Sequence, residues 1–150
     1  MSASESNVEY VTVAIGGQMF GIPVLSIEDV LGPQAIARVP LSPPQVAGAL
    51  NLRGRIVTAI DVRSRLGLQP IAGDAGAMSV VVEHHGHSYS LLIDDVGEVL
   101  SLSPEQFDRN PATLDPRWRE ISEGICRLDG ELLIILDVAR LLDYASAEAA

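Results

Sequence analysis

The chain is poor in positive charge, in cysteine and in long apolar runs. Ten basic residues stand against twenty acidic ones, which leaves a net charge of −10 at pH 7. Nucleic-acid-binding proteins present basic surface, so this balance argues against a nucleic-acid partner and also disfavours anionic membrane surfaces. The single cysteine, Cys126, excludes an intrachain disulfide and agrees with a reducing compartment.

No apolar run approaches the roughly 20 residues that a membrane-spanning helix needs. The first ten residues, MSASESNVEY, are polar and acidic, unlike a signal peptide. We therefore expect a cytoplasmic protein with no direct membrane insertion. A chain of 150 residues fits one domain or two small interlocked lobes. We expect residues 1–7 and 145–150 to be disordered.

Residues that could carry enzyme chemistry are few. All three histidines, His84, His85 and His87, fall in one expected hairpin turn, where further metal ligands are missing. Without another histidine there is no general base to activate a serine or Cys126 as a nucleophile. Cys126 alternates with apolar neighbours, so we expect it to be a small buried residue. The pattern predicts no catalytic site, no metal and no cofactor.

The most informative stretch is 51–68, NLRGRIVTAIDVRSRLGL. Gly54 interrupts an apolar run and can adopt positive φ without steric cost, which predicts a hairpin turn. The apolar residues that follow predict a strand buried on at least one face. Asp61 is then placed to cap a short helix that ends at Gly67. Four of the ten basic residues belong to this unit: Arg53, Arg55, Arg63 and Arg65.

The remaining apolar segments are short and bounded by turn residues, which is typical of strands. These predicted strands cover 10–15, 19–24, 79–83, 88–93, 96–102, 125–128 and 131–136. Residues 26–31 fit either a helical turn or a strand. A cap residue followed by two prolines predicts a short helix over 42–49, and 70–77 reads as a connector.

The two halves of the chain resemble each other. Segment 20–31 corresponds to 89–100, and segment 48–66 corresponds to 124–142. The second half carries about seven extra residues near 103–123, as the two offsets imply. A repeat of this length implies two lobes of similar fold, at about 8–77 and 78–144 and intertwined. Short strands with close turns predict two small antiparallel barrels.

At this point the sequence resembles the CheW family of chemotaxis coupling proteins. NLRGRIVTAIDVRSRL looks like the family signature, and FGIPVLSIEDVLG, SLLIDDVGEVLSL and GELLIILDVARLL resemble its other segments in order. The resemblance covers about 8–144. It implies a mainly β, CheW-like fold: two small five-stranded SH3-like β-barrels with a few short helices.

The resemblance also implies a function in two-component signal transduction. The family is a non-catalytic scaffold that couples the cytoplasmic tips of chemoreceptors to the regulatory domain of the histidine kinase CheA. That regulatory domain has the same fold, so the two can pair barrel to barrel and form rings. Two alternatives remain: the same fold in another kinase pathway, such as surface motility or biofilm control, and a small hydrolase or metal enzyme.

Partner-contact residues follow from the resemblance position by position. Arg53 corresponds to a position tied to receptor coupling, and Asp29 stands where the family often has the longer Glu. The full set is Ile27, Asp29, Val30, Gly48, Asn51, Arg53 and Gly54. Arginine is enriched at interface hot spots, and its planar fork suits a carboxylate or backbone acceptor. Trp118, in a stretch with no family match, is either a core anchor or an exposed partner contact.

Overall fold

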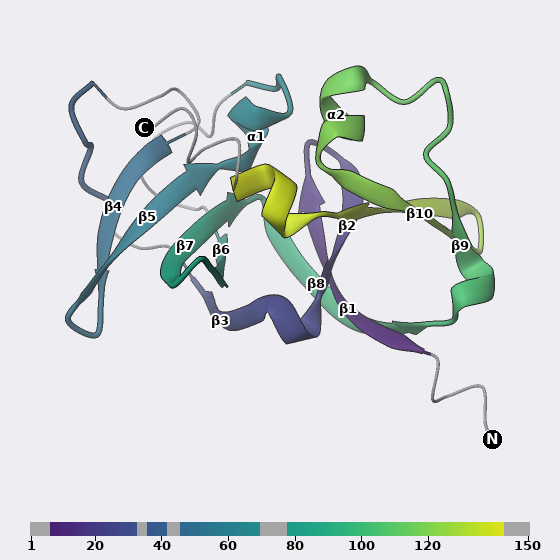
Figure 1. The fold of residues 1–150 in the computed structure, drawn as a ribbon, viewed down its shortest axis with the longest axis horizontal. Helices are drawn as coiled ribbons and strands as arrows, with labels where there is room; N and C mark the ends of the chain where they lie inside the picture. Colours follow the sequence, from purple (N-terminus) through teal and green to yellow (C-terminus); the bar gives the residue numbers. More distant parts are fainter. Residues whose placement is uncertain (1–6, 33–35, 42–45, 70–77, 143–150) are drawn as a thin grey trace.

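The computed structural model describes residues 7–32, 36–41, 46–69 and 78–142, and these residues form two β-sheets with a few short helices (Figure 1). The predicted mainly β fold class is confirmed. The ends expected to be disordered, apart from Asn7, and the connector at 70–77 lie outside the described residues. The side-chain amide of Asn7 donates to Ser101 Oγ at 3.3 Å.

The first sheet has six strands in the order β8-β1-β2-β11-β10-β9. Neighbours are antiparallel except β2 and β11, which run parallel. The strands are β1 (Val8–Ile15), β2 (Gln18–Pro23), β8 (Asp95–Leu102), β9 (Phe107–Asp108), β10 (Ser122–Leu128) and β11 (Glu131–Leu136).

The second sheet has five strands in the order β3-β6-β7-β5-β4, with β5 and β7 parallel. Its strands are β3 (Ile27–Leu31), β4 (Val46–Leu52), β5 (Arg55–Asp61), β6 (Met78–His84) and β7 (His87–Ile93). The short helices are η2 (Val24–Ser26), α1 (Val62–Arg65), η3 (Pro104–Gln106) and α2 (Pro116–Glu120). Residues 138–142 are also helical.

Each sheet takes strands from both of the lobes expected at about 8–77 and 78–144. The hairpin β1–β2 is extended by β8 on one side and by β11 on the other. The hairpin β6–β7 is extended in the same way by β3 and by β5. The two halves of the repeat thus exchange strands, so neither sheet can form from one half alone.

The repeat is visible in backbone geometry at two glycines. Gly48 and Gly124 both have φ of 153°, and each lies where the register of its strand pair shifts. A Cβ atom would lie 2.3 Å from the carbonyl oxygen of Ala37 at the first position and 2.7 Å from that of Asp108 at the second. Only glycine leaves room for a backbone segment to pass this closely.

The predicted hairpin, strand, cap and helix of 51–68 are confirmed. Asp61 caps α1 by accepting from the Ser64 N–H at 3.3 Å, and Gly67 follows the helix with φ of 78°. The second half repeats the cap, because Asp137 accepts from the Arg140 N–H at 3.1 Å.

The helix predicted over 42–49 is wrong where the structure describes it. Val46–Leu52 is the edge strand β4, which pairs with β5 along its length. Cross-strand pairing overrode a local capping pattern here, as tertiary contacts commonly do for weak propensities. Residues 26–31, which fitted either a helical turn or a strand, consist of the last residue of the short helix η2 followed by the strand β3.

Buried apolar side chains form three clusters. The largest is shared by the two sheets and includes Phe20 and Ile22 from one and Leu91 and Ile93 from the other. Each sheet also has a smaller cluster of its own. The cluster of the six-stranded sheet contains Cys126, whose expected burial is confirmed because its exposed fraction is 0%.

Trp118 is anchored at the junction between the lobes. Its ring lies 5.5 Å from that of Phe20, and its Nε1–H donates to the carbonyl of Leu66 at 3.0 Å. Beside it, Arg65 pairs with Glu120 at 3.4 Å. Figure 1 shows α1 and α2 at the same edge of the molecule. The extra segment of the second half therefore packs against the first half of the chain through these contacts.

Candidate partner-binding surface

The hairpin between β4 and β5 turns at two residues with positive φ. Arg53 has φ of 53° and Gly54 has φ of 86°, which is the pattern of a type I′ turn. The side chain of Asn51 supports the turn, because its Oδ1 accepts from the Gly54 N–H at 2.9 Å. Positive φ was predicted for Gly54 and is confirmed. The same conformation at Arg53 is unfavourable by about 1–2 kcal/mol for a residue with a Cβ.

Arg53 is held over β3 by an ion pair. Its Nη2 lies 3.2 Å from Asp29 Oδ2, while 79% of the Arg53 side chain remains exposed. β3 and β4 are the opposite edge strands of the five-stranded sheet. The Arg53–Asp29 pair therefore joins the turn after one edge strand to the other edge strand, which requires the sheet to curl. An ion pair this exposed contributes at most about 1 kcal/mol to stability.

A second, longer pair lies next to the first. Arg55 Nη2 is 3.9 Å from Glu28 Oε1, and the same carboxylate oxygen accepts from Ser88 Oγ at 3.0 Å. The resulting groove is lined by Glu28, Asp29, Leu52, Arg53, Arg55 and Val81. Two aliphatic side chains stand exposed on the strands that carry the pairs, Val30 at 40% and Ile56 at 72%. Exposed aliphatic groups among arginines and carboxylates suit a protein–protein contact.

The structure brings most of the expected contact residues together, and it places two differently. Asp29, Val30, Asn51, Arg53 and Gly54 belong to β3 and to the β4–β5 hairpin. Ile27, also on β3, is half-buried against the shared core. Gly48 is buried at the β4 bulge beneath Ala37 and Ile36. Gly48 thus shapes the backbone below the surface.

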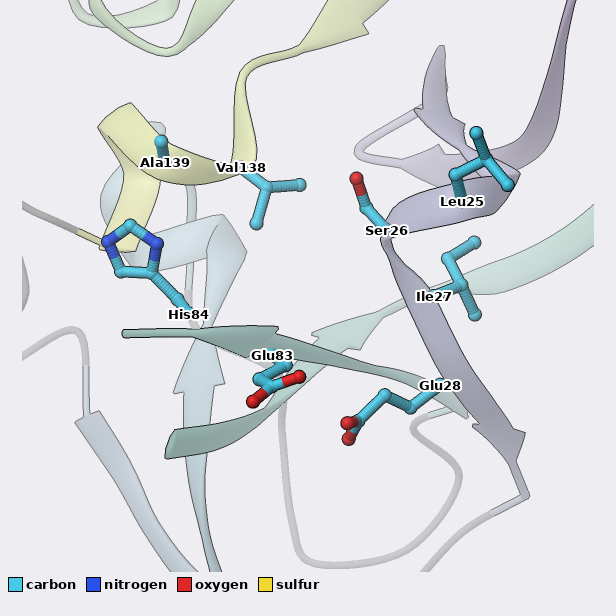
Figure 2. A pocket seen from close by; sticks show the side chains of 8 residues that line it. All are labelled: Leu25, Ser26, Ile27, Glu28, Glu83, His84, Val138 and Ala139. Carbon is cyan, nitrogen blue, oxygen red and sulfur yellow. The ribbon is translucent and has the colours of Figure 1, made fainter. Parts of the chain in front are cut away.

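A neighbouring hollow contains residues that sequence reasoning missed. Figure 2 shows side chains from three elements around it: η2 with the start of β3, the end of β6, and the helical residues 138–142. Leu25 on its rim is 98% exposed. Nothing local in the sequence indicated this exposure, because Leu25 lies between the expected strand at 19–24 and the segment 26–31 that fitted either a helical turn or a strand.

Two buried ionisable side chains, Cys126 and Tyr10, have raised pKa values. Burial raises the pKa of the Cys126 thiol to about 12. Burial, with the nearby Glu123 and Cys126, raises the pKa of Tyr10 to about 12. Burial also raises the pKa of Glu123, as does Asp137, against the opposing effect of Arg140. A thiol that stays protonated is a poor nucleophile.

Two further searches of the described ranges found nothing. No group of three or more His, Cys, Asp or Glu side chains there is arranged to hold a metal ion. None of the helices in these ranges is long and apolar enough to cross a membrane.

The fold and this surface define a two-sheet β protein with features suited to protein contacts. The chain belongs to the CheW family, because the model of the CheW-like domain matches residues 9–146. The probable chemotaxis protein CheW of Rhizobium etli is 26% identical over 99% of this chain and 96% of its own length. Chemotaxis protein CheW of Klebsiella aerogenes is 28% identical over 89% and 81%, respectively. The scaffolding protein TtCheW of Thermoanaerobacter tengcongensis superposes with a TM-score of 0.80 at 25% identity, covering 90% of this chain and 92% of that one.

Proposed function

We propose that the protein is a cytoplasmic, non-catalytic adaptor that couples chemoreceptor tips to the regulatory domain of the histidine kinase CheA. Family membership and the names of the relatives support this role. The observation that carries it is the exposed Arg53, held by Asp29 across the curled sheet beside Val30. A positively charged fork pre-positioned over an aliphatic rim is an efficient partner contact, since little side-chain freedom is lost on binding.

The residue set proposed for partner binding is Ile27, Asp29, Val30, Gly48, Asn51, Arg53 and Gly54. Its members differ in the role we propose. Asp29, Val30 and Arg53 make contacts, whereas Asn51 and Gly54 hold the turn that presents Arg53. Ile27 and Gly48 support the strands from below. Service in another kinase pathway uses the same surface, and co-purification from the native cell separates the two.

Arg53→Ala tests the proposal. The side chain is exposed and its ion pair is weak, so the free energy of unfolding should change by no more than about 1 kcal/mol. At the centre of an interface the same truncation should weaken binding by about 2 kcal/mol, roughly 30-fold. Arg53→Lys should recover only part of this loss, because an ammonium keeps the charge but lacks the fork. The measurements are denaturant unfolding and separate titrations against a receptor tip and the kinase regulatory domain.

Arg127→Ala is the matched control for the receptor titration. Arg127 is also exposed, at 61%, and is also ion-paired, with Asp108, but it lies on the β10–β11 hairpin. We expect it to bind the receptor tip like the wild type. Unchanged affinity of Arg53→Ala for both partners, or a loss explained by unfolding, would remove Arg53 from the site.

A further inference from the structure

The hairpin between β6 and β7 carries all three histidines of the chain. His84 ends β6 and His87 begins β7, and the two residues pair directly across the hairpin. His85 and Gly86 form the turn, with φ of 53° and 80°, which is the pattern of a type I′ turn. None of the three histidines belongs to the proposed partner-binding set, so the adaptor function leaves them without a role.

Folding of this turn does not require histidine. In the internal repeat the turn corresponds to Gly16-Gly17, where Ile15 and Gln18 pair across the hairpin of β1 and β2. Gly16 has φ of 60°, so the first half uses glycine for the conformation that His85 adopts in the second. A Cβ in this conformation costs about 1–2 kcal/mol. A large side chain in a strained turn points to a use other than folding.

Strand pairing places two of the imidazoles on the same face of the hairpin. Residues directly opposite each other on antiparallel strands have Cβ atoms about 4.5–5.5 Å apart, and their side chains project to the same side. Zinc binds imidazole nitrogens at about 2.0–2.1 Å, so one ion is within reach of both His84 and His87. The ring centroid of His85 lies 4.0 Å from that of His84, which places a third imidazole nearby.

The surroundings of the turn favour a cation. His84 lines the hollow together with Glu28 and Glu83 (Figure 2), and no arginine is among the described residues that line it. The net charge of −10 adds a long-range attraction for cations. Imidazole nitrogen suits zinc, nickel and copper, whereas magnesium and calcium prefer oxygen ligands. His85 and His87 are exposed and His84 is half-buried, so an ion can reach the turn from solvent.

We propose that the β6–β7 turn binds one divalent first-row transition ion through an imidazole nitrogen of His84 and one of His87. The missing further ligands argued against a closed metal centre in the sequence, but an open site completes its coordination shell with water. Two protein ligands make this a weak site that exchanges its ion with solvent. The site goes beyond the adaptor function, because it needs neither receptor nor kinase.

Calorimetric titration of the full chain, without a histidine tag, tests this with Ni²⁺ and Zn²⁺ over roughly 1 μM to 1 mM. We expect one ion per chain. His84→Gln and His87→Gln should each weaken Ni²⁺ binding at least about tenfold, since even changes outside the ligand set cost 10–100-fold at metal sites. His85→Gln should weaken it less, because this side chain projects from the turn and not from the strand pair.

Two controls separate a histidine site from simple attraction to an acidic protein. Glu83→Gln removes a negative charge beside the turn but keeps every imidazole, so its Ni²⁺ affinity should stay within about threefold of wild type. Ca²⁺ should bind at least about tenfold more weakly than Ni²⁺, because a calcium site is built from oxygen ligands. Urea unfolding of each variant should match the wild type, which shows that a lost ion is not a lost fold.

Three results would overturn the proposal. They are no binding of either transition ion up to the highest concentration, wild-type affinity in His84→Gln or His87→Gln, and equal binding of Ca²⁺ and Ni²⁺. A loss in Glu83→Gln as large as that in His84→Gln would also do so, because charge alone would then explain the binding. None of these residues is in the set proposed to bind receptor or kinase, so a failure here leaves the adaptor function standing.

Discussion

Replacing Gly48 by alanine should destabilise the protein more than it changes any partner contact. The new Cβ would lie 2.3 Å from the Ala37 carbonyl oxygen and 2.8 Å from Ile36 Cγ2. The neighbouring backbone hydrogen bonds, Ala37 N–H to Ala49 O and Ala49 N–H to Ala37 O, are both 2.8 Å long and would have to open. Two such bonds contribute about 1 kcal/mol each. Positive φ at a residue with a Cβ adds about 1–2 kcal/mol. We therefore expect a loss of about 3 kcal/mol.

Two matched glycines make the comparison sharp. Gly124→Ala meets the Asp108 carbonyl oxygen at 2.7 Å, so its cost should approach that of Gly48→Ala. Gly54→Ala has positive φ but nothing within 4 Å of the new Cβ, so only the backbone cost of about 1 kcal/mol applies. Urea unfolding followed by circular dichroism measures all three. The reasoning fails if Gly48→Ala loses no more stability than Gly54→Ala, or if it stays as stable as wild type while losing receptor binding.

Four further predictions concern the Trp118 contact, the buried thiol, the pH dependence of stability and a turn. Trp118→Phe should lower the unfolding free energy by about 1 kcal/mol, because the hydrogen bond to the Leu66 carbonyl is lost while the ring contact remains. An unchanged urea midpoint would show that this hydrogen bond does not stabilise the fold. Cys126 should not react with a thiol reagent at pH 8 until the protein unfolds, and rapid native labelling would refute its burial. Folding raises the pKa of Cys126 and of Tyr10 to about 12, so the stability that these groups contribute should be complete below pH 9 and fall as pH rises toward 12. A urea midpoint at pH 10.5 that is no lower than at pH 8 would contradict this direction. Gly130→Val should cost roughly 1–3 kcal/mol, because Gly130 has φ of 77°, and unchanged chemical denaturation would show that this turn tolerates a Cβ.

Local signals in the chain were sufficient wherever a few neighbouring residues decide the conformation. The positive φ of Gly54, the cap at Asp61 and the stop at Gly67 are all predictable from residue type. They depend on steric freedom and on hydrogen bonds within three residues. The helix predicted over 42–49 shows the limit of such signals, since 46–49 became strand through pairing with β5.

Residue type and spacing did not give the spatial arrangement of the expected contact residues. Arg53 and Asp29 are 24 residues apart in sequence, and nothing local indicates that they form an ion pair. That contact arises because the five-stranded sheet curls its edges together. Trp118 was ambiguous for a related reason, because its burial depends on which other segments cover it.

The sequence by itself determined the strand-rich pattern, the turns and the internal repeat. These properties follow from residue identity and spacing alone. Only the tertiary structure decided that β3 and β8 pair with strands of the other half, and that Trp118 in the extra segment donates to the Leu66 carbonyl just after α1. A repeat specifies which strands exist, but either half could satisfy its backbone hydrogen bonds with its own strands or with those of the other half. The choice depends on which pairing buries the shared apolar cluster, and that free energy is a property of the whole packed molecule.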